Sequence, residues 1–144
     1  MNIEIKFRGK SNHPESFSYG DFVFGSLIKR GELDPLINVY DENSSRDVRV
    51  DPNTIGQFTG LMDCKGREIF EGDIINYIRH RLDGTGFLEQ GKVEWRNEEG
   101  CYVFVNRFPT RDNRELVTPL IRCKEINVIG NIHDNPELME GGAQ

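Results

Sequence analysis

The sequence predicts a mostly β protein, on the border of the α+β class. Apolar and polar residues alternate in several short segments, as in residues 3–8 and 91–96. A period of two residues turns one side of a strand toward a core. Glycine, proline, asparagine and aspartate separate these segments, and such residues favour turns. Helix-start signals are clearest at residues 135–139, where Pro136 follows Asn135, which predicts one short C-terminal helical turn.

In the first half of the chain, the predicted strands are short and alternate with polar loops. Aromatic residues interrupted by Gly20 and Gly25 predict one or two strands rather than a helix. The predicted strands lie at residues 3–8, within 17–28, at 36–40 and around 48–50, and the predicted loops lie at 29–35 and 41–47.

In the second half, turns are the clearest signals. Asp63 and Gly66 occupy the first and fourth positions of a predicted β-turn, where aspartate bonds forward and glycine suits the exit. Pro119 limits residues 116–123 to an edge strand at most, because proline cannot donate to a ladder. Further strands are predicted at 74–78, 87–95, 101–105 and 125–133, with a hairpin turn at 97–100, a loop at 79–86 and a mobile loop at 107–115.

The 144 residues are the length of one domain. We expect a single domain over 1–144, with a looser part at 1–50 and a compact part at 55–133. The first fifty residues offer too few apolar positions for a core of their own. The start of the chain lacks the pattern of a signal peptide, and no apolar run approaches the ~20 residues needed to span a bilayer. A cytoplasmic protein without a membrane partner is therefore expected.

Charge is unevenly distributed along an acidic chain of net charge −6. Residues 74–124 carry nine Lys/Arg and seven Asp/Glu, or +2, whereas 1–73 and 125–144 each carry −4. The middle segment is therefore the only part that can locally attract a phosphate backbone. The candidate nucleic-acid contacts are Arg79, Arg81, Lys92, Arg96 and Trp95, together with His80, Arg107, Arg111, Arg114, Arg122, Lys124, Tyr77, Phe87, Tyr102 and Phe108. The alternative is a solvated face above core aromatics, with Trp95 pairing with Tyr102 across a hairpin.

Catalytic signals are weak. Glu71 and Asp73 flank Gly72 and can serve as an acid–base pair or hold a divalent cation, but the favoured role of Asp73 is to accept backbone N–H groups in the turn. Cys123 with His133 is a second, less favoured pair. Phosphate-binding glycine motifs are absent from the sequence, and no cofactor is predicted.

Metal and disulfide chemistry are also not predicted. The cysteines and histidines lack the close spacing of a structural zinc site, and three widely spaced cysteines favour reduced thiols. These residues are Cys64, Cys101, Cys123, His13, His80 and His133.

Several stretches resemble the YopX-like proteins. The opening 5–10 and the central 50–61 followed by 69–75 are similar to that family, as is the close at 128–132 and 135–140. The resemblance implies a small protein of phages, prophages or related mobile elements, without a secure activity. The turn and strand at 72–75, followed by 91–95 and a hairpin, also look like the plan of a small SH3-like β-barrel, here expected around 55–133 with an N-terminal strand layer.

Three functions remain open at this point. The first is an accessory protein that acts by binding, as an adaptor to a host or phage protein, with exposed β edges that can add strands or form a homo-oligomer. The second is a nucleic-acid-binding small barrel that uses residues 79–124. The third, and least favoured, is an enzyme at Glu71 and Asp73.

Overall fold

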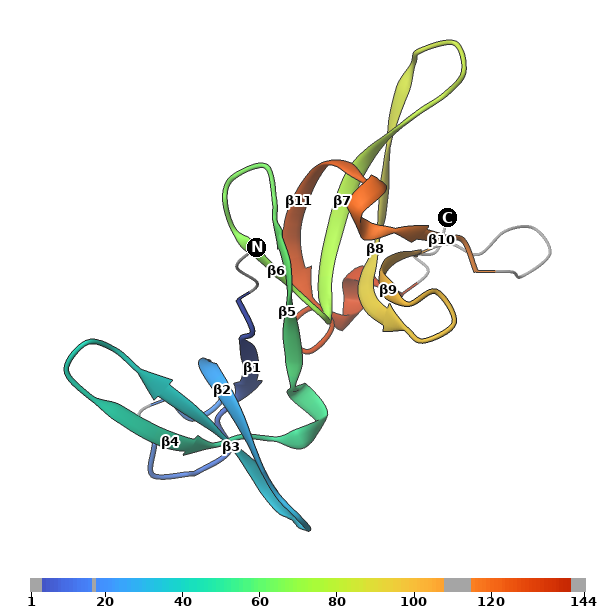
Figure 1. Ribbon diagram of the computed structural model, residues 1–144. Coiled ribbons are helices and arrows are strands. Elements are labelled where there is room, and N and C mark those ends of the chain that lie inside the picture. Colours follow the sequence, from blue (N-terminus) through green and yellow to red (C-terminus); the bar gives the residue numbers. More distant parts are fainter. Residues whose placement is uncertain (1–3, 17, 108–114, 141–144) are drawn as a thin grey trace. The chain divides into compact units, whose positions relative to one another are not determined.

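The computed structural model describes residues 4–16, 18–107 and 115–140 (Figure 1). The chain divides into two compact units, Met1–Gly60 and Leu61–Gln144, here called unit 1 and unit 2. The described residues are mostly β, as predicted. The strands are β1 (Phe7–Lys10), β2 (Phe22–Arg30), β3 (Leu33–Tyr40), β4 (Ser45–Arg49), β5 (Gly56–Met62), β6 (Glu68–Phe70), β7 (Asp73–His80), β8 (Gly86–Arg96), β9 (Cys101–Asn106), β10 (Val117–Pro119) and β11 (Lys124–Asn131).

Unit 1 contains β1 to β4 and most of β5, in the strand order β4-β3-β2-β1-β5. β6, which follows β5 in this order, belongs to unit 2. The loop predicted at 29–35 is much shorter than expected, because β2 continues to Arg30 and β3 begins at Leu33. The end of this hairpin is exposed on both faces and carries charged residues, so its composition is that of a loop although its backbone forms strands. A 3-10 turn, η1 (Pro52–Thr54), follows β4, and the Asp51 side chain accepts from the Asn53 backbone N–H at 2.9 Å.

A small aliphatic cluster forms the core of unit 1. Its buried members are Val23, Ile37, Val48 and Val50. The expectation that the first fifty residues lack a core is therefore wrong. Isolated apolar positions on separate strands converge only when β2, β3 and β4 pair, for example Ile37 with Val48.

Unit 2 contains an antiparallel sheet in the order β10-β9-β8-β7-β11. The strands predicted at 74–78, 87–95 and 101–105 are all present, and β10 is the predicted short edge strand that ends at Pro119. The loop predicted at 79–86 is reduced to a tight hairpin connection, because β7 runs to His80 and β8 begins at Gly86.

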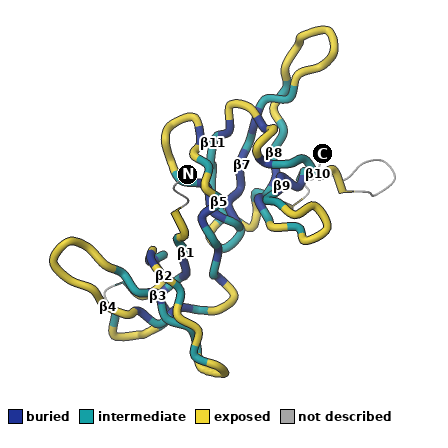
Figure 2. Tube along the Cα trace, viewed as in Figure 1, coloured by how far each residue is buried: buried dark blue, intermediate teal, exposed yellow. Residues whose placement is uncertain are grey.

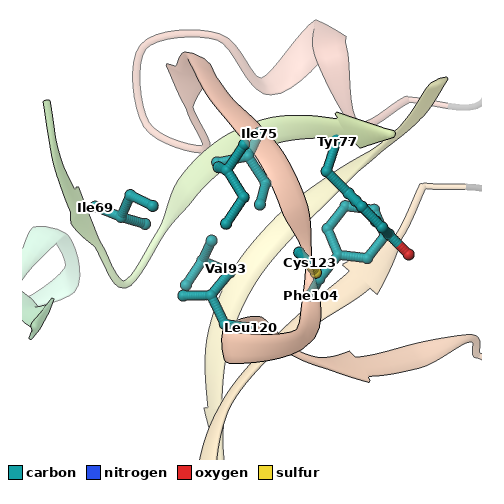
Figure 3. Close-up of a cluster of buried hydrophobic side chains, with 8 residues drawn as sticks. Ile69, Ile75, Tyr77, Val93, Phe104, Leu120 and Cys123 are labelled. Atoms are coloured by element: carbon teal, nitrogen blue, oxygen red, sulfur yellow. The ribbon is translucent and has the colours of Figure 1, made fainter. Parts of the chain in front are cut away.

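The core of unit 2 lies on one face of this sheet (Figure 3). The Tyr77 and Phe104 rings meet edge to face with their centroids 4.8 Å apart, and a second 3-10 turn, η2 (Leu120–Arg122), contributes buried Leu120. The buried members are Ile69, Ile75, Tyr77, Val93, Phe104, Leu120, Cys123 and Ile126. Most of the backbone drawn as buried in unit 2 belongs to the central strands, whereas the hairpin tips are exposed (Figure 2).

Two buried carboxylates fix the turns of unit 2. Asp63 accepts from the backbone N–H groups of Lys65, Arg67 and Val128 at 2.8 to 3.1 Å, which confirms the turn predicted at 63–66. Burial alone would raise the pKa of Asp63, but these hydrogen bonds lower it below its usual value. Asp73 is 2% exposed and accepts from the Phe70 N–H at 2.8 Å, as its predicted structural role requires.

The described strands of unit 2 do not close into a barrel, so the expected SH3-like barrel at 55–133 is not confirmed. β10 and β11 stand at opposite ends of the strand order. The end at β10 is a strand of three residues that stops at Pro119, whose nitrogen cannot extend a ladder.

The C-terminal segment of unit 2 carries a single 3-10 turn, η3 (Pro136–Leu138), where the sequence predicts a helical turn. Asn135 makes no side-chain cap there; its Oδ1 instead accepts from the Asn131 backbone N–H at 3.3 Å. The helical elements of the described residues have three residues each, and none is long and apolar enough to cross a membrane.

Candidate functional site

The β7–β8 hairpin extends as a two-stranded arm beyond the strands beside it (Figure 1). β7 and β8 pair with each other as far as His80 and Gly86. β8 pairs with β9 only from Gly91 onward, and β7 pairs with β11 only as far as Ile78. Among the described residues, no strand therefore pairs with the backbone edge of β8 along residues 86–89 on the side of β9.

A groove of about 500 Å³ lies along this open edge. Its lining residues are Asn76, Phe87, Leu88, Glu89, Gln90, Asn106, Arg107 and Leu116. β9 ends at Asn106, whose backbone N–H donates to the Leu116 carbonyl at 2.9 Å, and the next residue, Arg107, donates to the Gln90 carbonyl at 2.8 Å. In the part of the chain that the structure describes, the groove thus lies where a longer β9 would pair with β8, and we call it the β8 slot.

The lining of the β8 slot comes from both faces of the sheet. Four consecutive residues of β8, 87–90, contribute to it, and consecutive side chains of a strand point to opposite faces. A molecule bound on one face would contact alternate residues only. The slot therefore borders both faces of the sheet at this strand edge, and Asn76 of β7 extends its lining over the face that carries Leu88 and Gln90.

A polar network borders the slot on the core face. Arg79 Nε and Glu89 Oε1 form an ion pair at 2.9 Å, although the angle at Nε is not that of a hydrogen bond. The Asn106 amide donates to Glu89 Oε2 at 2.9 Å. The Arg79 guanidinium also donates to the Thr118 hydroxyl at 2.9 Å. Glu89 is thus held in place by two strands and has only 10% of its side chain exposed.

The predicted nucleic-acid contacts do not gather on one face. Arg79 is paired with Glu89 on the core face, while Lys92 lies on the opposite face of β8, 3.4 Å from Glu94. Arg96 pairs with both Glu94 and Glu115, at 2.7 and 2.8 Å.

Acidic partners reduce the positive charge that this segment presents. Burial alone would raise the pKa of Glu94, but the Arg96 hydrogen bond and the Lys92 charge lower it. The same pairing raises the pKa of Arg96. Arg81 instead stacks on the Phe87 ring, 4.3 Å from its centroid, near the arm tip.

Trp95 packs edge to face on Tyr102 across the hairpin, with centroids 5.1 Å apart, as the alternative interpretation predicted. Its indole N–H donates to the Asn97 side chain at 2.6 Å. Phe108, Arg111 and Arg114 lie outside the described residues.

The cysteines that were considered as catalytic or metal-binding groups do not form a reactive site in the described residues. Cys123 lies in the core of unit 2, where burial raises the pKa of its thiol to about 11; the thiolate that a nucleophile needs is therefore disfavoured. Cys64 is exposed and Cys101 is half-buried, and both are free thiols. Within the described residues, Cys, His, Asp and Glu form no group of three able to hold a metal ion.

Sequence analysis missed the residues that define the β8 slot. Leu88, Glu89 and Asn106 have no motif in common, and they meet only through the register of β8 and β9. The sole available signal was Leu88, an apolar residue that breaks the alternation of its strand and is 64% exposed.

Comparison with known proteins identifies the family. The chain has no significant match among curated proteins. The crystal structure of protein EF1440 from Enterococcus faecalis is similar in fold, with 20% sequence identity and a TM-score of 0.50 over 96% of this chain and 100% of that one. The family model described as YopX protein matches residues 6–140. The chain therefore belongs to the YopX protein family.

Proposed function

We propose that this chain is an accessory protein of a phage or prophage that acts in the cytoplasm by binding a partner protein, and that the β8 slot is its contact site. The observation that carries the proposal is the open edge of the arm. Leu88 is 64% exposed and Leu82, at the arm tip, is fully exposed. An open strand edge beside exposed apolar side chains is a template for association with another chain.

The charge distribution favours a protein over a nucleic acid as the partner. Arg79, Lys92 and Arg96 each lie within 3.4 Å of a carboxylate. A phosphate backbone would have to compete with those carboxylates, in a chain of net charge −6. The slot is lined by carboxamides, apolar side chains and one residue of each charge, Glu89 and Arg107, so an apolar protein segment can bind there without competing for a cation.

The placement of the candidate catalytic groups favours binding over catalysis. Asp73 has its carboxylate engaged in a turn, and the Cys123 thiol has a pKa raised to about 11. Neither offers a reactive group to the β8 slot, whose own carboxylate, Glu89, is held by Arg79 and Asn106.

A capture experiment with matched variants tests the proposal. The tagged full chain is captured from a lysate of its native host with and without nuclease, beside Leu88→Asp and Leu33→Asp. Leu33 is the matched control because it has the same 64% exposure but lies in unit 1. The expected result is a stoichiometric, nuclease-resistant protein that the wild type and Leu33→Asp retain and Leu88→Asp loses.

Two results would contradict the proposal. Equal retention of the partner by Leu88→Asp would place the contact site outside the β8 slot. Co-purifying DNA or RNA that salt removes, without a protein partner, would favour a nucleic-acid-binding function.

A further inference from the structure

The backbone of β8 shows which groups face the slot. In an antiparallel sheet, the N–H and C=O of one residue point to the same neighbouring strand, and this direction alternates along the chain. The Gln90 carbonyl accepts from Arg107, on the β9 side. Leu88 and Gly86, two and four residues away, therefore turn their N–H and C=O groups toward the slot. Among the described residues, no strand pairing reaches them from that side.

We infer that the β8 slot binds an extended segment of the partner protein, which adds as a strand along residues 86–89 and takes the place of a longer β9. This inference rests on the proposed function and names the form in which the partner binds. The incoming backbone satisfies the hydrogen-bonding groups of Gly86 and Leu88, as a neighbouring strand does in a sheet.

The size of the site favours an extended segment over a second copy of the chain. The open edge of four residues is only ~13 Å long at ~3.3 Å per residue. A stable dimer generally buries ~800 Å² on each partner, from ~20–30 residues a side. The slot of about 500 Å³ lies instead in the range of sites that enclose a short ligand.

The slot also specifies the side chains of its ligand. The ligand residue opposite Leu88 projects to the face on which Leu88 lies exposed, and an apolar side chain there covers it. The two flanking residues project to the other face, between Phe87 and Leu116. An acidic residue beside Glu89 would meet a like charge, so the partner segment lacks acidic residues and is mainly apolar over these three positions.

The other edges of this sheet are protected, unlike the β8 slot. At β11, the Cys64 N–H donates to the Ile126 carbonyl at 2.8 Å, and the Val128 N–H donates to the Asp63 carboxylate at 3.1 Å. At β10, the strand is three residues long and ends at Pro119. Short edges, prolines and covering loops are the usual defences against unwanted strand addition. The segment 86–89 contains no proline, and among the described residues no loop covers its edge as the Asp63 turn covers β11.

Peptides provide a defined probe. Eight-residue peptides are selected from a random library on the immobilised full chain, and one is synthesised. Amide hydrogen exchange of the protein is measured by NMR with and without this peptide. The dissociation constant is measured for the wild type, Leu88→Pro and Leu88→Val. Proline removes an N–H that faces the slot rather than β7, so the β7–β8 ladder keeps its bonds, while valine keeps the N–H and serves as the matched control.

The expected result is at least about tenfold slower exchange of the Leu88 amide in the complex. Leu88→Pro weakens binding at least about tenfold, and Leu88→Val changes it less than about threefold. If Leu88→Pro fails to fold, the exchange measurement on the wild type decides alone. Unchanged exchange at Leu88 in the complex, or failure to select any peptide that binds the slot, overturns strand addition. The proposed function fails separately, when Leu88→Asp keeps the captured protein partner.

Discussion

Units 1 and 2 bury apolar residues on different scales and protect their sheet edges in different ways. Unit 1 has a cluster of four buried aliphatic residues, whereas the cluster of unit 2 has eight members and includes the Tyr77–Phe104 ring pair. Unit 2 also contains two buried carboxylates, Asp63 and Asp73, that accept backbone N–H groups. Unit 2 therefore has the larger buried core and the turns that are fixed by buried side chains.

The edges of the units show where function is expected. The outermost strand of unit 1, β4, carries Arg46, Asp47 and Arg49, and charged side chains on an edge discourage association. The open edge of unit 2 carries Phe87 and Leu88 instead. An unprotected apolar edge on the better-packed unit suggests a binding site supported by a rigid scaffold.

The largest expected effect is the removal of the central ring of unit 2. Phe104 is fully buried, so Phe104→Ala lowers the free energy of unfolding by about 3–5 kcal/mol, through lost burial and a cavity. Urea denaturation followed by Trp95 fluorescence measures it, because Trp95 is the only tryptophan and lies in unit 2. The conservative Ile37→Val in unit 1 costs about 0.5–1.5 kcal/mol. A loss below about 1 kcal/mol for Phe104→Ala would contradict the described core.

Two glycines allow the same change to be made in each unit. A Cβ at Gly25 would lie 1.9 Å from the Asn38 carbonyl oxygen, and one at Gly91 would lie 2.0 Å from that of Val105. Gly25→Ala and Gly91→Ala each force two strands apart, at a cost of about 1–3 kcal/mol.

Trp95 fluorescence distinguishes the two glycine variants, because it follows the unfolding of unit 2. Gly91→Ala lowers the urea midpoint of this signal more than Gly25→Ala does. Gly9→Ala is the milder control, since its nearest neighbour is the Val50 side chain at 3.0 Å. Equal shifts for Gly25→Ala and Gly91→Ala would mean that the two units unfold together.

Asp63 makes the stability of unit 2 sensitive to acid. Its folded pKa is lowered, so its contribution is fully present above the unfolded pKa of ~3.9 and is lost as pH falls through the folded value. Asp63→Asn costs about 1–2 kcal/mol at pH 7, and the cost declines as the pH falls through the folded pKa of Asp63. Urea denaturation of the wild type and Asp63→Asn at a series of pH values from 7 downward measures this decline. If Asp63→Asn lowered the free energy of unfolding by the same amount throughout the acid unfolding range, the carboxylate would not be the group that stabilises this turn.

The smallest expected effect is a difference in thiol reactivity within unit 2. Thiol labelling reports on unit 2 alone, because all three cysteines lie beyond residue 60. Cys64 is exposed, whereas burial raises the pKa of Cys123 to about 11. At pH 8 we expect Cys123 to react more slowly than Cys64 by on the order of a hundredfold, because thiolate is the reactive form. Mass spectrometry of labelled peptides measures both rates, and equal rates would show that the core opens readily.

Local signals allowed much of unit 2 to be predicted, whereas long-range pairing was not predictable. The turn at Asp63 depends on residues within four positions, and the buried face of β8 follows from the alternation around Val93. The core of unit 1 escaped prediction because Ile37 and Val48 become neighbours only through pairing.

The β8 slot escaped prediction for a related reason. The slot exists because β8 spans residues 86–96, whereas β9 pairs only with its residues 91–96. Amino-acid composition does not encode this difference between the lengths of β8 and β9. The charged residues that suggested a basic face were equally uninformative about pairing. Arg79 and Glu89 are ten residues apart in sequence and meet only across β7 and β8.

Site-specific photocrosslinking tests the central claim most directly. A photoreactive amino acid replaces Leu88 in one sample and Leu33 in another, and each full chain is irradiated in its native host. We predict one crosslinked partner protein from position 88 and none from position 33, with the crosslink mapped to an extended, mainly apolar segment of the partner without acidic residues. Equal crosslinking from both positions, or none from position 88 while a partner co-purifies, would contradict a protein-binding site at the β8 slot.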